Sequence, residues 1–485
     1  MSFLKKLAGQ TAVYGLSSIL GRLLNYLLVP LYTTAFAPDE YGVLTELYAY
    51  AAFLNVLYIY GLETAYFRFS KDGDTVFPIA FSSIFISSLL FSGVIWLASD
   101  SIALILEYPE KGACIRWLSL ILTLDAIVAI PFAQLRKEGK AVKFAAFKIS
   151  NIGANVLLNL FFIVFCPRFL AENPAHFLSA IYEPKLGVGY VFLSNLVANA
   201  LYLMFFMSTW KKVRLQFDKM EWLRMMNYAW PVLIIGFTGV TSEMLSRIIL
   251  KHRLPEGFYP EYSNLEIVGI FGACYKLSVF MTLAVQAFRY AFEPFFFNRA
   301  KDKNAPQVFS KVMNYFVILT SFSWLVLCLF MPYYAPIFLR QESYLIALDA
   351  VPWLLGGGMF LGVFYNLSLW YKLTDKTLYG AYMSLTGALS TLFLNWVLIP
   401  VYGYLGSAYA TFFSYLLMVI ISYVWGRKHY PVPYDLGSIM LYIIISLTGI
   451  IFCTYFEYDI FITICVILTF LLCVFILQKK DFIGR

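Results

Sequence analysis

Five basic residues lie deep inside long apolar segments of this sequence, where charged side chains are rare: Arg22, Lys148, Arg247, Lys276 and Arg289. The chain holds 36 Lys and Arg residues, and nearly all the others lie in short loops between those segments. A basic side chain at the centre of a bilayer costs roughly 2.5–3.5 kcal/mol on insertion scales. Several such charges therefore predict an interior lined by water or protein. The simplest ligand for a positively charged interior is an anionic substrate that crosses the membrane.

Acidic residues in the same apolar segments are candidates for ion coupling. Glu243 precedes Arg247 by one helical turn, so the two side chains share a helix face. This spacing favours an internal ion pair, or an arginine that alternates between Glu243 and substrate. Asp125 is the better coupling candidate, since an intramembrane carboxylate can exchange a proton or a sodium ion. Its alternative role is a salt bridge to one of the five bases.

A polar stripe follows Lys148 along one predicted helix. Asn151, Asn155 and Asn159 lie three, seven and eleven residues after it, on one side of a helix with 3.6 residues per turn. A stripe three turns long is not expected to face lipid. It either lines a cavity, where the amides bond to substrate, or packs against another helix. The cavity is the preferred interpretation.

Composition excludes a soluble protein. The 485 residues are 61% hydrophobic and only 13% charged, with a mean hydropathy of +0.74. The net charge of +8 fits basic cytoplasmic loops better than nucleic-acid binding. The seven cysteines form no CxxC pair and the three histidines lie in separate loops, so neither a metal site nor any cofactor is predicted.

Hydropathy predicts an all-α polytopic membrane protein with about fourteen transmembrane helices, each of about 20 mainly apolar residues. The expected spans are 10–34, 41–67, 76–98, 113–135, 142–166, 187–209, 224–250, 265–292, 308–331, 344–370, 377–399, 402–426, 436–456 and 458–477.

Loop charge sets the expected orientation. With the N-terminus in the cytoplasm, the loops and helix ends hold 24 basic residues inside and 7 outside. Both termini are therefore expected to be cytoplasmic. No predicted extramembrane segment is longer than 167–186, which leaves no room for a soluble catalytic domain, so a transporter is expected rather than an enzyme.

A faint internal repeat relates the two halves of the chain. Residues 41–44 (YGVL) resemble residues 268–271 (VGIF), and Tyr48 matches Tyr275 at the same shift. A displacement by six helices preserves orientation, so the halves are expected to be parallel repeats with the substrate site between them. The expected parts are an N-terminal lobe (1–215), a C-terminal lobe (216–430) and an appended helix pair with a cytoplasmic tail (431–485).

Several motifs resemble those of polysaccharide flippases of the MOP superfamily, whose drug-exporting branch is the MATE family. Arg22 is followed by residues 29–33 (VPLYT) and 38–42 (PDEYG), which are similar to the opening of those proteins. Residues 268–271 with Tyr275 and Lys276 resemble their eighth helix. Residues 394–400 and 403–408 (GYLGSA) resemble the hairpin between their helices 11 and 12.

The resemblance implies a function and a set of site residues. The substrate would be a polyprenyl-pyrophosphate-linked oligosaccharide, moved across the bacterial inner membrane by alternating access. The product would feed surface polysaccharides such as the O-antigen of lipopolysaccharide, alongside polymerase or ligase partners. Arg22, Arg247 and Lys276 map to the basic cavity residues of the family. Ser246 departs from the pattern, because relatives often carry an acid there.

Three other functions remain open. A flippase for a lipid-linked peptidoglycan precursor shares the fourteen-helix plan. A cation-coupled multidrug exporter of the same superfamily is disfavoured, because it predicts an acidic cavity and usually twelve helices. A membrane polysaccharide polymerase or ligase is disfavoured by the absence of a long expected periplasmic loop.

Overall fold

The computed structural model of the chain is all-helical, and the structure describes residues 19–24, 26–70, 73, 75–211, 215–299, 302–374, 376 and 378–483. No strand occurs among these residues. The chain divides into two compact units, residues 1–244 and 245–485, with the division inside one long helix. Each unit is described by itself below. The predicted lobe boundaries at 215 and 430 stay predictions.

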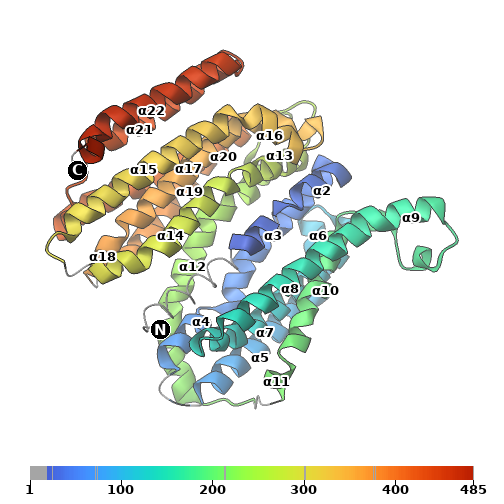
Figure 1. The fold of residues 1–485 in the computed structure, drawn as a ribbon. Coiled ribbons are helices and arrows are strands. Elements are labelled where there is room, and N and C mark those ends of the chain that lie inside the picture. The colour runs from blue at the N-terminus through green and yellow to red at the C-terminus, as the bar shows by residue number, and fades with distance from the viewer. Residues whose placement is uncertain are drawn as a thin grey trace. The chain divides into compact units, whose positions relative to one another are not determined.

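The first unit contains the helices of the N-terminal half (Figure 1). They are α2 (Val29–Ala35), α3 (Pro38–Ile59), α4 (Leu62–Phe69), α5 (Val76–Leu97), α6 (Ser99–Ile105), α7 (Gly112–Lys137), α8 (Ala141–Leu160), α9 (Cys166–Glu172), α10 (Gly189–Phe205), α11 (Met207–Trp210) and most of α12 (Lys219–Arg253).

Helix α7 forms the centre of this unit, because it packs against α3, α5 and α10 and is buried along most of its length. Helix α8 is peripheral and packs mainly on α10. Its buried residues are Ala141, Ala145, Asn151 and Asn159, which share one face, while most of its remaining side chains are exposed or half-buried. The polar stripe of α8 therefore faces the interior of the unit and the apolar face is left for lipid.

The second transmembrane span is broken where α3 meets α4. Tyr60 and Gly61 both have positive φ, at 34° and 75°, so the helical hydrogen-bond ladder is interrupted there. A Cβ added at Gly61 would lie 2.5 Å from the carbonyl oxygen of Ala229 in α12. Glycine fits this position for two reasons: its left-handed backbone and the close approach of a neighbouring helix.

The second unit contains the helices of the C-terminal half, most of which are α-helical spans (Figure 1). They are the last turns of α12, α13 (Asn264–Leu277), α14 (Val279–Arg299), α15 (Ala305–Leu329), α16 (Met331–Phe338), the 3-10 segment η5 (Glu342–Ala350), α17 (Val351–Leu367), α18 (Leu369–Leu373), α19 (Leu378–Tyr402), α20 (Tyr404–His429), α21 (Leu436–Tyr455) and α22 (Ile460–Ile483).

Helix α20 packs extensively against both α17 and α19 in this unit. A Cβ at Gly356 of α17 would lie 2.7 Å from the Phe412 ring of α20 and 2.8 Å from that of Trp324 in α15. The small side chain therefore permits tight helix packing. Helix α21 lies along α15 and pairs with α22, so the appended pair belongs to this unit (Figure 1).

The predicted spans agree with the observed helices. Eleven helices or helix pairs among the described residues are long and apolar enough to cross a membrane, and α13 with α14 adds a span bent by 41°. Helix α10 is apolar but shorter, at 17 residues. Together these account for every predicted span after the first. The first span, 10–34, lies partly outside the described residues.

Candidate functional site

A chain of side-chain hydrogen bonds crosses the interior of the first unit. Asn199 of α10 donates from Nδ2 to Oδ1 of Asp125 in α7, at 3.0 Å. Asn151 of α8 donates in turn to Oδ1 of Asn199, also at 3.0 Å. Asn151 and Asn199 are both buried. One acid is thus linked to two neighbouring helices through neutral amides.

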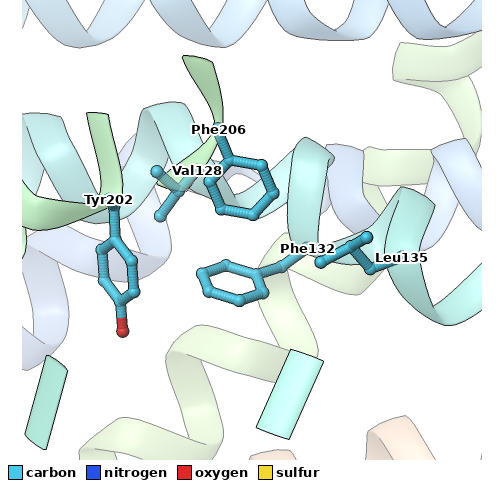
Figure 2. Close-up of a cluster of buried hydrophobic side chains, with 5 residues drawn as sticks. All are labelled: Val128, Phe132, Leu135, Tyr202 and Phe206. Carbon is cyan, nitrogen blue, oxygen red and sulfur yellow. The ribbon is translucent and has the colours of Figure 1, made fainter. Parts of the chain in front are cut away.

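Lys148 lies one turn before Asn151, and its charge interacts with that of Asp125. The ammonium group lies 4.4 Å from the centre of the Phe132 ring and 5.4 Å from that of Tyr202. Figure 2 shows these two rings with Val128, Leu135 and Phe206 in one buried cluster. A cation over aromatic faces is stabilised by the ring quadrupoles. Lys148 is therefore stabilised by two aromatic rings, in the field of Asp125.

The stripe continues toward the other end of α8. Asn159, which is fully buried, accepts a hydrogen bond from Tyr32 of α2 at 3.0 Å. Its own amide group donates to the backbone and side-chain oxygens of Asn155, at 2.8 and 3.0 Å. Asn195 donates to the hydroxyl of Tyr48 in α3 at 2.9 Å. These contacts join α8 to neighbouring helices, as the packing alternative for Asn151 and Asn159 expects. That the stripe lines a cavity remains a prediction.

This network, consisting of Lys148, Asp125, Asn151, Asn155, Asn159 and Asn199, is the strongest candidate site within one unit. It holds one base and one acid in an apolar helical bundle, with amides that can donate or accept. Such an arrangement can bind and release a proton or a small cation at Asp125. It can also rearrange when the helices shift, because each amide has a second hydrogen-bonding group.

In the second unit, Arg247 is buried, at 7% exposure, and its guanidinium lies 4.3 Å from the centre of the Tyr275 ring. The neighbouring Ser246 accepts a hydrogen bond from the buried Asn395 of α19, at 3.1 Å. Lys276 follows Tyr275 on α13 and its side chain is exposed. The structure therefore brings Arg247 against Tyr275, the residue that directly precedes Lys276 on α13.

Other predicted residues lie on the surfaces of the helices. Arg22 is exposed in a helical stretch, residues 19–24. Glu243 is exposed although Arg247, one turn later on α12, is buried, so the two side chains have different surroundings. Arg289 of α14 is half-buried, with its guanidinium 5.0 Å from the centre of the Tyr365 ring.

Two carboxylates acquire partners that sequence reasoning did not identify. Glu46, fully buried in α3, accepts a hydrogen bond from Tyr108, which lies between α6 and α7. Glu63 of α4 forms an ion pair with Arg136 at the end of α7. The position of Glu46 within an apolar span could have identified it from the sequence as a buried acid. Neither partner is a sequence neighbour, so the pairing depends on the packed fold.

Among the residues that the structure describes, no group of three or more His, Cys, Asp or Glu side chains could hold a metal ion. All seven cysteines are free thiols, and five of them are buried.

Comparison with known proteins finds one family model that matches part of the chain and several solved structures with a similar fold. Residues 36–167, from the start of α3 to α9, match a family model described as a polysaccharide biosynthesis protein. No curated protein sequence matches the chain. The whole chain is similar to solved structures at low sequence identity.

One similar structure is the lipid II flippase MurJ in an inward closed conformation. It has a TM-score of 0.72 and 13% identity, and the match covers 97% of this chain and 99% of that one. A second is an inward-facing multidrug resistance MATE transporter of the MOP superfamily. Its TM-score is 0.63 at 13% identity, with 84% and 94% of the two chains covered.

A third similar structure is a MOP superfamily transporter from Pyrococcus furiosus, described as having a binding pocket of reverse polarity that suggests a different function. Its TM-score is 0.53 at 13% identity, with 87% and 95% of the two chains covered. At these identities the likenesses establish the fold. They confirm the all-helical architecture and the resemblance predicted from the sequence motifs.

Proposed function

From the premise that this chain has the fold of the MOP superfamily and a segment matching polysaccharide biosynthesis proteins, we propose that it is a flippase for a polyprenyl-pyrophosphate-linked oligosaccharide. Pyrophosphate and acidic sugars are anions, so a cavity lined by bases offsets their lost hydration. The sugars would pass through the polar interior while the prenyl chain stays in lipid. Transport by alternating access would supply surface polysaccharide such as O-antigen and hand the substrate to polymerase or ligase partners.

The observation that carries this proposal is that two basic side chains are exposed although they lie deep within membrane-spanning segments. Arg22 lies near the middle of the first predicted span, and Lys276 lies at the thirteenth residue of α13, yet both side chains are exposed on their own units. Arg22 lies in the middle of its predicted span, and Lys276 lies at the bend between α13 and α14, so neither is near enough to an end of its span to reach the membrane surface easily. A base exposed at this depth would be costly against lipid. We therefore infer that each of the two bases faces water on its own unit, where it can bind the anionic headgroup.

The orientation follows from the loop charges. We place both termini in the cytoplasm of a bacterium and the chain in its inner membrane, with the substrate carried from the inner to the outer leaflet. The acid of the buried network provides a site for ion coupling. Asp125 is the proposed acceptor of a proton or sodium ion, with Glu243 as a second candidate.

A lipid-linked peptidoglycan precursor is a second candidate substrate. The observation that favours it is the match to the MurJ structure, which extends over 97% of this chain and so includes the appended helices α21 and α22. This precursor also carries a pyrophosphate, so the basic residues suit both substrates. The two candidates differ in the groups attached to the pyrophosphate, which are an oligosaccharide in one and a sugar that bears a peptide in the other.

The test compares both substrates in one assay. The purified chain would be reconstituted in vesicles with a fluorescent polyprenyl-pyrophosphate oligosaccharide or a fluorescent peptidoglycan precursor, and flipping measured by quenching from outside. We expect the wild-type chain to flip the oligosaccharide, and Arg22→Ala and Lys276→Ala to abolish flipping. Arg22→Lys should retain part of the activity because it preserves the charge.

The matched control is Lys185→Ala, which removes an exposed base from the loop before α10. It should flip as the wild type does. In cells that lack the native gene, the Ala variants should accumulate the lipid-linked intermediate although the protein remains in the membrane. Normal flipping by both Ala variants would contradict the charge argument, and flipping of the peptidoglycan precursor alone would assign the second substrate.

A further inference from the structure

A cavity of about 390 Å³ lies within the first unit, at the end of α7 opposite the α6–α7 connection. Its walls come from α4, α5, α7, α8 and α11, together with the connections between helices. The polar side chains that matter here are Ser70, Gln134, Lys137, Lys140, Lys143 and Thr209. No residue predicted from the sequence as part of the site lines this cavity.

The cavity carries a net positive charge. Three lysines and one glutamate, Glu138, line it. Lys140 pairs with Glu138 at 2.6 Å, and Lys137 donates to the backbone oxygen of Ser70. The ammonium of Lys143 lies 5.3 Å from the centre of the Phe147 ring. Among the lining residues that the structure describes, one carboxylate therefore balances one of three ammonium groups, and two positive charges remain for an anion.

The start of α8 adds to this positive field. The helix runs for 20 residues from Ala141, and Lys140 at its N-cap provides no capping hydrogen bond from its side chain. The first backbone N–H groups of a helix have no partner within the helix, and the helix dipole makes that end positive. Since Lys140 and Lys143 both line the cavity, these N–H groups begin at its wall.

The cavity is closed on its inner side by apolar side chains. Leu135 and Phe206 line it and also belong to the buried cluster in Figure 2, whose Phe132 and Tyr202 contact Lys148. An aromatic layer thus separates this cavity from the network around Asp125. An anion held by Lys137 and Lys143 would not share a pocket with Lys148.

We propose that this cavity binds a phosphate group. Lysines bind phosphate as point charges, and hydroxyl and amide groups such as those of Thr209 and Gln134 can donate to the remaining oxygens. A doubly charged phosphate matches the two uncompensated ammonium groups. The group can come from the headgroup of an anionic membrane lipid or from a soluble phosphate compound. This inference depends on contacts inside one unit and not on the proposed function.

The test measures binding by calorimetry with the full chain in detergent and a phosphate-free buffer. The probes are inorganic phosphate, a short-chain phosphatidic acid and, as the neutral comparison, the phosphatidylcholine of the same chain length. The variant replaces all three lysines, Lys137→Gln, Lys140→Gln and Lys143→Gln. Loss of two charge-assisted contacts should weaken binding of the anionic probe about 100-fold. Added salt should weaken wild-type binding in the same direction.

A matched control removes three exposed lysines from elsewhere, with Lys185→Gln, Lys303→Gln and Lys428→Gln. It lowers the net charge equally and should bind as the wild type does. A second cavity variant, Ser208→Trp, fills the space without changing charge, since Ser208 is an exposed residue of the lining. It should abolish binding while thermal unfolding stays that of the wild type.

Each outcome has one meaning. Binding of inorganic phosphate and phosphatidic acid, both lost in the two cavity variants, supports the site with a soluble source. Binding of phosphatidic acid alone supports it with a lipid source. Equal binding of phosphatidic acid and phosphatidylcholine overturns the proposal. Binding that survives in the triple-lysine variant, or in a folded Ser208→Trp variant, overturns it as well.

Discussion

Lys148 and Asp125 show how this protein keeps a base and an acid in an apolar bundle. Each charge is solvated by neutral groups: two aromatic rings for Lys148, and the amide of Asn199 for Asp125. Burial without such partners would be strongly unfavourable. The arrangement also leaves each charge able to exchange partners, because an amide and a ring bind less tightly than a direct ion pair.

Removing one of these two charges should cost more than removing both. Asp125→Asn preserves the shape and leaves Lys148 without its acid, and Lys148→Met does the reverse. We expect both single variants to unfold at lower temperature than the wild type, and the double variant to recover part of the loss. The coupling should be roughly 0.5–3 kcal/mol.

The measurement is thermal unfolding of the four proteins in detergent, followed by circular dichroism. The control cycle pairs Asp125→Asn with Lys428→Met, since Lys428 is exposed and lies in the other unit. Additive effects in the Lys148 cycle would contradict the coupling.

At the scale of elements, the spans could be predicted and their interruptions could not. Runs of apolar residues set the bounds of α5, α7, α15 and α21 to within a few residues, because the bilayer thickness fixes a minimum length. The break after Ile59 lies where Gly61 packs against Ala229, a residue far along the chain.

Gly61→Ala tests that break. The substitution places a Cβ 2.5 Å from the Ala229 carbonyl oxygen and forces a non-glycine residue into φ of 75°. We expect a loss of about 1–3 kcal/mol in the free energy of unfolding.

The matched control is Gly153→Ala in α8, where an added Cβ meets nothing within 4 Å. It should be neutral or stabilising by about 0.5–1 kcal/mol, because alanine is the better helix former. Equal destabilisation by both variants would show that Gly61 has no special role.

The candidate site, too, could be predicted only in part. The stripe of Asn151, Asn155 and Asn159 could be predicted from its spacing, and so could the unusual depth of Lys148. Their partners could not, because Asn199, Tyr32 and Tyr202 lie on other helices and meet the stripe only after folding. Glu46 escaped prediction although its own position in an apolar span was visible.

At the scale of the whole molecule, the loop charges predict which ends of the helices face the cytoplasm. Lys185→Cys should react with a membrane-impermeant maleimide in intact cells, because its loop is expected outside. Lys303→Cys should react only after the membrane is permeabilised. Both positions are exposed, so access to reagent depends on sidedness alone.

The parent chain sets the background, since its own cysteines lie mostly within the spans and five are buried. Labelling of both variants in intact cells, or the reverse pattern, would reject the predicted orientation. The overall fold needs no such test, because hydropathy and the MurJ and MATE likenesses agree on it.

The two helices that the predicted repeat matches, α3 and α13, are interrupted at different levels. At the shift that pairs Tyr41 with Val268, the bend after Leu277 corresponds to Tyr50, where α3 is continuous. The interruption at Tyr60 comes about ten residues, or roughly 15 Å of helix, later than that equivalent point. In the predicted repeat, α3 and α13 would therefore pivot at different depths, because each changes direction at a different position of the shared pattern.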